Sequence, residues 1–135
     1  MYMKNIHLEK KAIFAVLLLC CIIMLTGCYR ATLKNTVEEI NYRYPALVEP
    51  GVMATSVALK DNYVVYRHNV DETQCNLMAL GEVSPEEKLA ELRNKGVDER
   101  EFLRLVRRSG MGLRYEYIGD GSGIVVSCTI ENAML

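Results

Sequence analysis

His68 and Cys75 are the two side chains in this sequence that could form a nucleophile and its base. They stand seven residues apart, and an imidazole that takes the proton of a thiol creates a nucleophilic thiolate. No motif around them marks such a pair. His68 lies in an alternating apolar run, which is typical of a half-buried strand residue whose ring is hydrogen-bonded. We therefore expect neither residue to be catalytic.

A bound metal or cofactor is not expected either. The sequence has two histidines and five cysteines, and none of them has a C-x-x-C or H-x-x-x-H spacing. A zinc site at His68 would need carboxylates to complete it. The carboxylate pair 86–87 has the position of a helix cap and the pair 71–72 that of a solvated strand end, so general acid–base catalysis is not indicated.

The glycine-rich segment GDGSG, at residues 119–123, could bring backbone amides up to a phosphate. A dinucleotide-binding loop, however, leads from a strand into a helix, and here a β-branched run begins at Ile124. Gly121 also occupies the place where a G-x-S-x-G elbow needs its serine. The segment therefore predicts a hairpin turn.

The amino-terminal residues have the pattern of an export signal. Lys10 and Lys11 precede an unbroken apolar run over 12–25, which is shorter than the ~20 residues that span a bilayer as a helix. The run ends at residues 25–28 in the tetrapeptide LTGC. This tetrapeptide resembles the lipobox of bacterial lipoproteins, and an ordinary membrane anchor or a signal cut elsewhere are the alternatives.

The lipobox resemblance implies that the Cys28 thiol takes a diacylglycerol group and becomes the first residue of the mature protein. It also implies a membrane-anchored protein, because each buried acyl CH₂ contributes about 0.8 kcal/mol. In Gram-negative lipoproteins an aspartate after the cysteine favours the inner membrane. Tyr29 stands there, so the resemblance implies the outer membrane with the domain facing the periplasm; a Gram-positive cell surface is the alternative.

The chain then divides into a signal peptide over 1–27, a lipidated N-terminus with a first helix and connection over 28–50, and a small domain over 51–135. The net charge is −1, and the segment before Cys28 carries +2, so the mature part carries −3. Binding to nucleic acid needs clustered lysines and arginines. We therefore expect no nucleic-acid partner. A Pro-Gly-Ser-rich tether is missing after Cys28, so the domain should lie close to the membrane.

Two cysteines remain in the mature domain, Cys75 and Cys128. In an oxidising compartment they could form a disulfide, which would close a loop of about fifty residues and stabilise the fold by roughly 4 kcal/mol. Two separate buried thiols are the alternative, because the spacing does not show whether their Cα atoms approach within ~7 Å.

The apolar spacing predicts a first helix over 32–43 that ends before Pro45. Two β-rich runs follow over 53–59 and 63–70, and Lys60-Asp61-Asn62 between them indicates a hairpin. Serine, proline and glutamate at the start of the next run predict a capped helix over 85–95, with another over 99–109. Strands over 113–118 and 124–130 complete a second hairpin. Helix, hairpin, two helices and hairpin predict an α+β fold, a four-stranded antiparallel sheet with helices packed on one face.

Alternation along the strands predicts which side chains face the helices. Leu113, Tyr115 and Tyr117 are expected to point inward. Small residues at 54, 56 and 58 are expected on the opposite, outer face, together with a candidate partner surface formed by Val65, Arg67, Arg114, Glu116 and Thr129. Edge strands also offer unpaired backbone for strand addition.

The helix over 99–109 carries four arginines, at positions 100, 104, 107 and 108. They could meet anionic lipid headgroups, but Glu99 and Glu101 dilute the charge and helix C-termini commonly carry cations. A solvated helix face is the simpler interpretation.

A strong anchor without a catalytic set favours a non-catalytic binding or accessory subunit of an envelope assembly, with a protein partner. The alternative is an inhibitor or immunity protein against an envelope-targeting hydrolase, which the mildly acidic mature charge and the candidate disulfide would suit. An enzyme that uses His68 and Cys75 is the third hypothesis.

Overall fold

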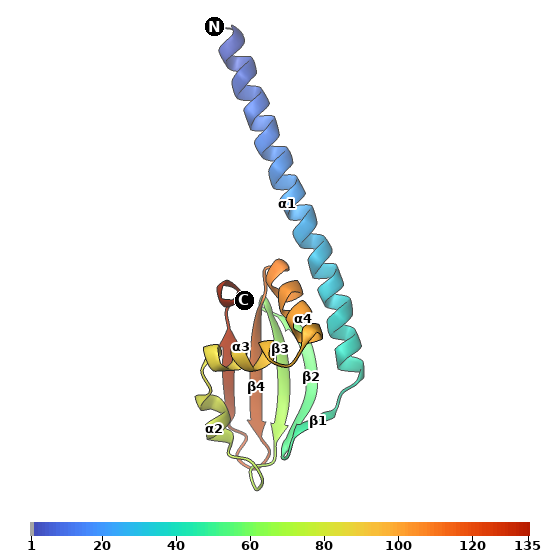
Figure 1. Ribbon diagram of the computed structural model, residues 1–135, viewed down its shortest axis with the longest axis vertical. Coiled ribbons are helices and arrows are strands. Elements are labelled where there is room, and N and C mark those ends of the chain that lie inside the picture. Colours follow the sequence, from blue (N-terminus) through green and yellow to red (C-terminus); the bar gives the residue numbers. More distant parts are fainter. Residues whose placement is uncertain (1) are drawn as a thin grey trace.

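The computed structural model describes residues 2–135, with side chains from Ile6 onward, and a long first helix dominates its shape. Helix α1 spans Tyr2–Tyr42 without a break. Its first half projects away from the folded domain, and its last turns lie against that domain (Figure 1). The helix predicted over 32–43 is therefore the end of a much longer element.

The last part of α1 belongs to the core of the domain. Leu33 is 0% exposed and Val37 is 4% exposed, and burial of two such side chains contributes about 3–6 kcal/mol. The Asn41 side chain accepts a hydrogen bond from the Val57 backbone N–H at 3.0 Å, so it also satisfies a donor that β2 would otherwise leave open. No flexible segment separates Cys28 from the domain, because helix α1 runs through both.

The sheet has five strands in the order β1-β2-β3-β4-β5. Their bounds are Ala46–Glu49, Val52–Lys60, Tyr63–Val70, Gly112–Gly119 and Val125–Ile130. Neighbouring strands are antiparallel except β3 and β4, which are parallel. The α+β class and both predicted hairpins are confirmed, but the prediction of four antiparallel strands is wrong. It missed the four-residue β1 and took the two hairpins to pair in the antiparallel sense.

The turns between the strands follow from local sequence. Asp61 and Asn62 have φ values of 51° and 66°, the left-handed conformation that these residue types tolerate in two-residue hairpin turns. Gly51, between β1 and β2, has φ 81°, and a Cβ there would also meet the Gln74 and Cys75 side chains. Glycine is therefore required at position 51.

A β-bulge in β2 changes the predicted facing of one residue. Ala54 pairs with His68 but Ser56 pairs with Arg67, so Thr55 is the extra residue. The Thr55 hydroxyl donates to the Arg67 carbonyl at 3.2 Å, which anchors the bulge. Ala54 consequently faces the core and is 0% exposed, which contradicts its predicted outer position, because strict alternation assumes an unbroken ladder.

Three helices connect β3 to β4 along the chain, namely α2 (Leu77–Glu82), α3 (Pro85–Arg93) and α4 (Val97–Arg108). Helix α3 begins as predicted, because Ser84 accepts from the Glu87 N–H and Pro85 occupies the first turn. Helix α2 was not predicted. The N-cap of α4 is Gly96, so this helix begins at Val97, two residues before the predicted start at residue 99. A short 3₁₀ helix, η1 (Asn132–Met134), follows β5.

The helices lie on one face of the sheet, as predicted. Figure 1 shows α3 and α4 in front of the strands, and one apolar cluster contains buried residues of all four α-helices and of strands β2 to β5. Val64, Val70, Leu113 and Ile130 are each 0% exposed in it. The opposite sheet face carries no described helix.

Candidate functional site

A groove lies on the helix-bearing face of the sheet, between β1 and α3. It encloses a cavity of about 300 Å³. We call it the tyrosine groove, and its lining comprises Tyr44, Val48, Glu49, Val52, Tyr66, His68, Lys88, Glu91, Leu92, Lys95, Glu99, Tyr115 and Tyr117. Residues from β1, β3, β4, α3 and the start of α4 therefore meet at one place.

Aromatic rings from β3 and β4 stack against one another along the groove. Tyr66 and Tyr115 are stacked with centroids 5.0 Å apart and 5° between their planes. His68 stacks on Tyr117 at 4.7 Å and on Tyr115 at 6.2 Å. The parallel register creates these contacts, because it pairs Tyr66 with Tyr115 and His68 with Tyr117. The stack is a rigid apolar platform.

His68 is 5% exposed and its stacked ring is part of this platform. Its Nδ1 lies 3.2 Å from the Glu116 carbonyl oxygen, which can only accept, so Nδ1 carries the proton and Nε2 is the acceptor. Burial lowers the pKa of His68, the carbonyl opposes that shift, and Lys88 and Lys95 lower the pKa further. The ring is therefore neutral at pH 7.

The tyrosine hydroxyls of the groove are also held neutral. Burial raises the pKa of Tyr66 and of Tyr115, and it raises the pKa of Tyr117 to about 12. Lys88 lies over the Tyr115 ring, with Nζ 4.8 Å from its centroid. These neutral phenols can donate or accept hydrogen bonds, but they do not supply a base for catalysis.

Strand β1 forms an exposed wall beside the groove. Val48 lines the groove and is 53% exposed. Leu47 is 67% exposed and pairs with Met53, which is 41% exposed, so these two side chains lie on the opposite face of the sheet. Tyr42 at the end of α1 is 91% exposed. Because β1 is an edge strand, these side chains surround unpaired backbone that a second chain could pair with.

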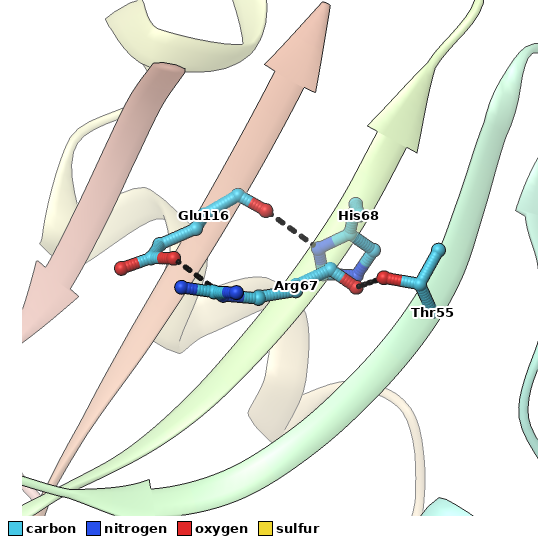
Figure 2. Close-up of polar contacts among 4 residues, drawn as sticks. All are labelled: Thr55, Arg67, His68 and Glu116. Carbon is cyan, nitrogen blue, oxygen red and sulfur yellow. Dashed lines mark hydrogen bonds and ion pairs between the residues drawn. The ribbon is translucent and has the colours of Figure 1, made fainter. Parts of the chain in front are cut away.

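The predicted partner surface is brought together on the other face of the sheet. The register pairs Val65 with Arg114 and Arg114 with Thr129, and it pairs Arg67 with Glu116. Figure 2 shows Arg67 directed at the Glu116 carboxylate, while His68 reaches the backbone carbonyl of the same residue.

The charged side chains of that surface already have partners within it. Arg67 Nε lies 3.2 Å from Glu116 Oε2, and Arg114 Nε donates to the Thr129 hydroxyl at 3.3 Å. Val65 is 5% exposed, so it offers little area to a partner. The surface stays a prediction.

Cys75, Cys128 and the candidate metal-binding side chains are the remaining residues that could carry out chemistry. Cys75 and Cys128 are free thiols in the structure, and their pairing stays a prediction. Among the described residues no hydrogen bond joins His68 to Cys75, and residues 2–135 contain no cluster of three side chains fit to hold a metal ion.

The glycine-rich segment is a hairpin turn between β4 and β5, as predicted. The Glu72 carboxylate accepts from the backbone N–H groups of Gly121 and Ser122 at 3.2 and 2.8 Å, and from the Ser122 hydroxyl at 2.8 Å. Hydrogen bonds from Ser122 lower the pKa of Glu72. The amides that a phosphate would need are therefore occupied by the protein's own carboxylate.

Cys28 lies within α1, near the turn where the helix first contacts the domain, and its side chain is exposed. The segment from Ile6 to Tyr42 is long and apolar enough to cross a membrane. This corrects the expectation that the segment is too short, because the uncharged stretch continues from Leu25 through Tyr29 in the same helix. A cleaved signal sequence has the same length and composition, so lipidation of Cys28 stays a prediction.

The sequence placed Tyr115 and Tyr117 on an inward strand face and His68 at a half-buried strand position, but it did not predict the groove. Two signals were available. The run of helices between residues 70 and 112 is long enough for a parallel crossover, which would place the tyrosines of the two strands side by side. The short segment ALVE before the Pro50-Gly51 turn was the second signal, because a turn of this kind commonly joins paired strands.

No protein-family model matches this chain, and no curated protein matches its sequence. Solved structures do match its fold. The type II secretion system pilotin AspS from Vibrio cholerae aligns with a TM-score of 0.58 at 9% identity, over 84% of this chain and 97% of that one.

Two further solved structures have the same arrangement. The pilotin EpsS of the Vibrio vulnificus type 2 secretion system aligns with a TM-score of 0.55 at 11% identity, over 82% of this chain and 94% of its own. A Pseudomonas aeruginosa protein described as secreted aligns with a TM-score of 0.55 at 11% identity, over 78% of this chain and 91% of that one. The chain is therefore similar in fold to two type II secretion pilotins.

Proposed function

We propose that this protein is a membrane-anchored accessory subunit of an envelope assembly, and that it binds a protein partner through the tyrosine groove and the exposed wall of β1. The observation that carries the proposal is the juxtaposition of the aromatic platform with the exposed apolar side chain of Val48, on an edge strand. The fold similarity to pilotins of type II secretion systems supports the same role.

The chemistry of the groove fits a peptide segment with apolar side chains. Its platform is neutral, because burial raises the pKa of Tyr115 and lowers that of His68. Its rim carries both signs of charge, with Glu91 on α3, Lys95 in the turn after α3 and Glu49 on β1. An apolar segment flanked by polar residues would fill such a site, whereas a small substrate would meet no activated group there.

The edge of β1 suits an extended segment. Strand β1 pairs with β2 alone in the described sheet, so its other edge can donate and accept backbone hydrogen bonds. Strand addition at such an edge gives affinity through the backbone, and neighbouring pockets give specificity. A partner strand beside β1 would direct alternate side chains into the tyrosine groove.

The proposed anchor is a lipid on Cys28, which places the domain on the periplasmic side of the outer membrane. Cys28→Ser separates this anchor from a spanning α1. If the protein is lipidated, Cys28→Ser abolishes its labelling with radioactive palmitate and leaves it at the size of the precursor. If α1 spans the membrane, the protein is not labelled and the substitution does not change its size. Thr26→Ser is the matched control, because it conserves a small hydroxyl side chain.

Paired substitutions test the partner site. Val48 is 53% exposed on β1 and Val125 is 55% exposed on β5, the opposite edge of the sheet. We expect Val48→Glu to abolish co-purification of the partner after chemical crosslinking in intact cells, and Val125→Glu to leave it unchanged. Loss of the partner with Val125→Glu alone would refute the groove as the site. Capture of a hydrolase that the protein inhibits would favour the inhibitor hypothesis instead.

A further inference from the structure

A second cavity lies on the other side of α3, between α3, α4 and the C-terminal residues. It encloses about 210 Å³. We call it the arginine cavity, and its lining comprises Leu89, Arg93, Arg100, Leu103, Arg104, Arg107 and Leu135. Four guanidinium groups thus share one small space with three leucines.

The charge of this cavity is uncompensated by side chains. No aspartate or glutamate is among its lining residues, and the ion pairs of the described residues involve Arg67, Lys88 and Lys95 but none of these four arginines. Like charges spaced by three or four residues on a helix repel one another. A site with this arrangement is completed by an anion, and guanidinium groups match the geometry of phosphate oxygens.

The arginines follow one side of α4. Positions 100, 104 and 107 recur at four and three residues, so their side chains lie one above the other along the helix. Arg93 joins them from α3. Arg107 is about 10 Å nearer the C-terminal end of α4 than Arg100, at 1.5 Å per residue. The cavity therefore extends toward that end of the helix.

The C-terminal end of α4 is the part of the domain that meets α1 just after Cys28. Arg30 Nε donates to the Ser109 carbonyl at 3.0 Å, and the Arg108 guanidinium lies over the Tyr29 ring, 5.6 Å from its centroid. Ser109 is 0% exposed, so this contact is fixed. Figure 1 shows α1 leaving the domain beside this end of α4.

Both forms of anchor place this end of the domain on the membrane. A lipid on Cys28 lies one residue before the Tyr29–Arg108 contact, and the uncharged stretch of α1 that could lie in a bilayer ends at the same turn, before Arg30. The headgroup layer is about 5–7 Å thick on each side of a bilayer. Arg107 and Arg104 are thus within reach of lipid phosphates.

We propose that the arginine cavity binds the phosphate headgroup of an anionic phospholipid in the membrane that holds α1. Arg104 and Arg107 bind the phosphate oxygens, and the lining leucines lie against the apolar part of the lipid that follows. The bound headgroup fixes the orientation of the domain relative to the membrane surface. The interaction uses none of the groove residues, so its failure would leave the proposed partner binding untouched.

Chemical modification of the arginines tests the proposal on the full-length chain. The protein is inserted into vesicles of phosphatidylcholine alone or of an equimolar mixture with phosphatidylglycerol, treated with phenylglyoxal, and analysed by mass spectrometry. We expect phosphatidylglycerol to protect Arg104 and Arg107 by about fivefold, the change expected for one guanidinium held at an anionic surface. Arg67, whose side chain is 51% exposed on the far sheet face, is the internal control and should react equally in both vesicles.

Two further arms decide between the sources of phosphate. Sodium phosphate is compared with sodium chloride at equal ionic strength in the phosphatidylcholine vesicles. Protection by sodium phosphate without protection by phosphatidylglycerol would show a site for a free anion and would overturn the lipid proposal, as would equal reactivity in both vesicles. Arg93 and Arg100 line the same cavity, so any protection of these two by phosphatidylglycerol should be abolished in the double variant R104Q/R107Q. The variant R67Q/R114Q should preserve the protection of Arg104 and Arg107.

Discussion

The tyrosine groove and the arginine cavity lie on opposite sides of helix α3 and are built in opposite ways. The groove is lined by core residues, since Tyr115, Tyr117 and His68 are 5–7% exposed and belong to the sheet. The cavity is lined by surface arginines that carry no ion pair among the described residues. The groove residues therefore contribute to the stability of the fold, whereas the fold does not depend on the charged residues of the cavity.

This difference explains how each site can be probed. Substitution of a stacked residue in the groove changes both the stability of the fold and the shape of the site. Partner binding by the groove is therefore best tested by substitution of the exposed Val48. Arginines of the cavity can be replaced with little effect on folding. A loss of lipid contact in such a variant then reports on binding alone.

The largest expected effect is on stability, from Tyr115→Ala. Truncation of a buried aromatic residue costs about 3–5 kcal/mol of unfolding free energy, and here it also removes the stacking partner of Tyr66. Urea denaturation of the detergent-solubilised protein, followed by circular dichroism, measures it. Tyr42→Ala is the control, because Tyr42 is 91% exposed. A loss below about 1 kcal/mol would show that the platform is not part of the core.

A smaller effect is expected from the protonation of His68. Its pKa is lowered in the folded protein, chiefly by burial, while an unfolded histidine titrates near pH 6.5. The unfolded chain then binds the proton more readily, so stability is full above about pH 6.5 and falls as the pH drops below it. The urea midpoint should fall between pH 7.5 and 5.5, and His68→Gln should reduce that fall. An unchanged pH dependence in the variant would contradict a buried neutral ring.

The smallest effect is expected in the arginine cavity. Arg104→Gln removes repulsion from Arg100 and Arg107, which should stabilise the protein by about 0.2–0.5 kcal/mol. The gain should vanish at high salt, because salt screens exposed charges. Parallel urea titrations at low and high sodium chloride measure it. Destabilisation by more than about 1 kcal/mol would show that the arginine packs as a structural residue.

The local features of the fold could be predicted from sequence because each depends on a few neighbouring residues. Asp61 and Asn62 take the turn conformation expected of them, and Ser84 caps α3. The pairing of β3 with β4 depends instead on contacts between residues some fifty positions apart, as in Tyr66 with Tyr115. Parallel and antiparallel partners have the same alternating pattern, so the pattern alone did not distinguish them.

The sites were harder to predict than the elements. Inward-facing Tyr115 and Tyr117 followed from alternation, but the groove exists only because the parallel register brings His68 and Tyr66 beside them. The arginines of α4 were assigned to a solvated face, because the sequence does not show that Arg93 of α3 would join them around one cavity. Ala54 was misplaced by the bulge at Thr55, which alternation cannot anticipate.

Position-specific photocrosslinking in intact cells shows whether the tyrosine groove binds the partner. p-Benzoylphenylalanine is placed at Val48, in the wall of the tyrosine groove, and separately at Val125, on the opposite edge of the sheet. We predict one protein adduct from position 48 that disappears when Leu47→Glu is added, and no such adduct from position 125. An adduct from position 125 with none from position 48 would refute partner binding at the groove.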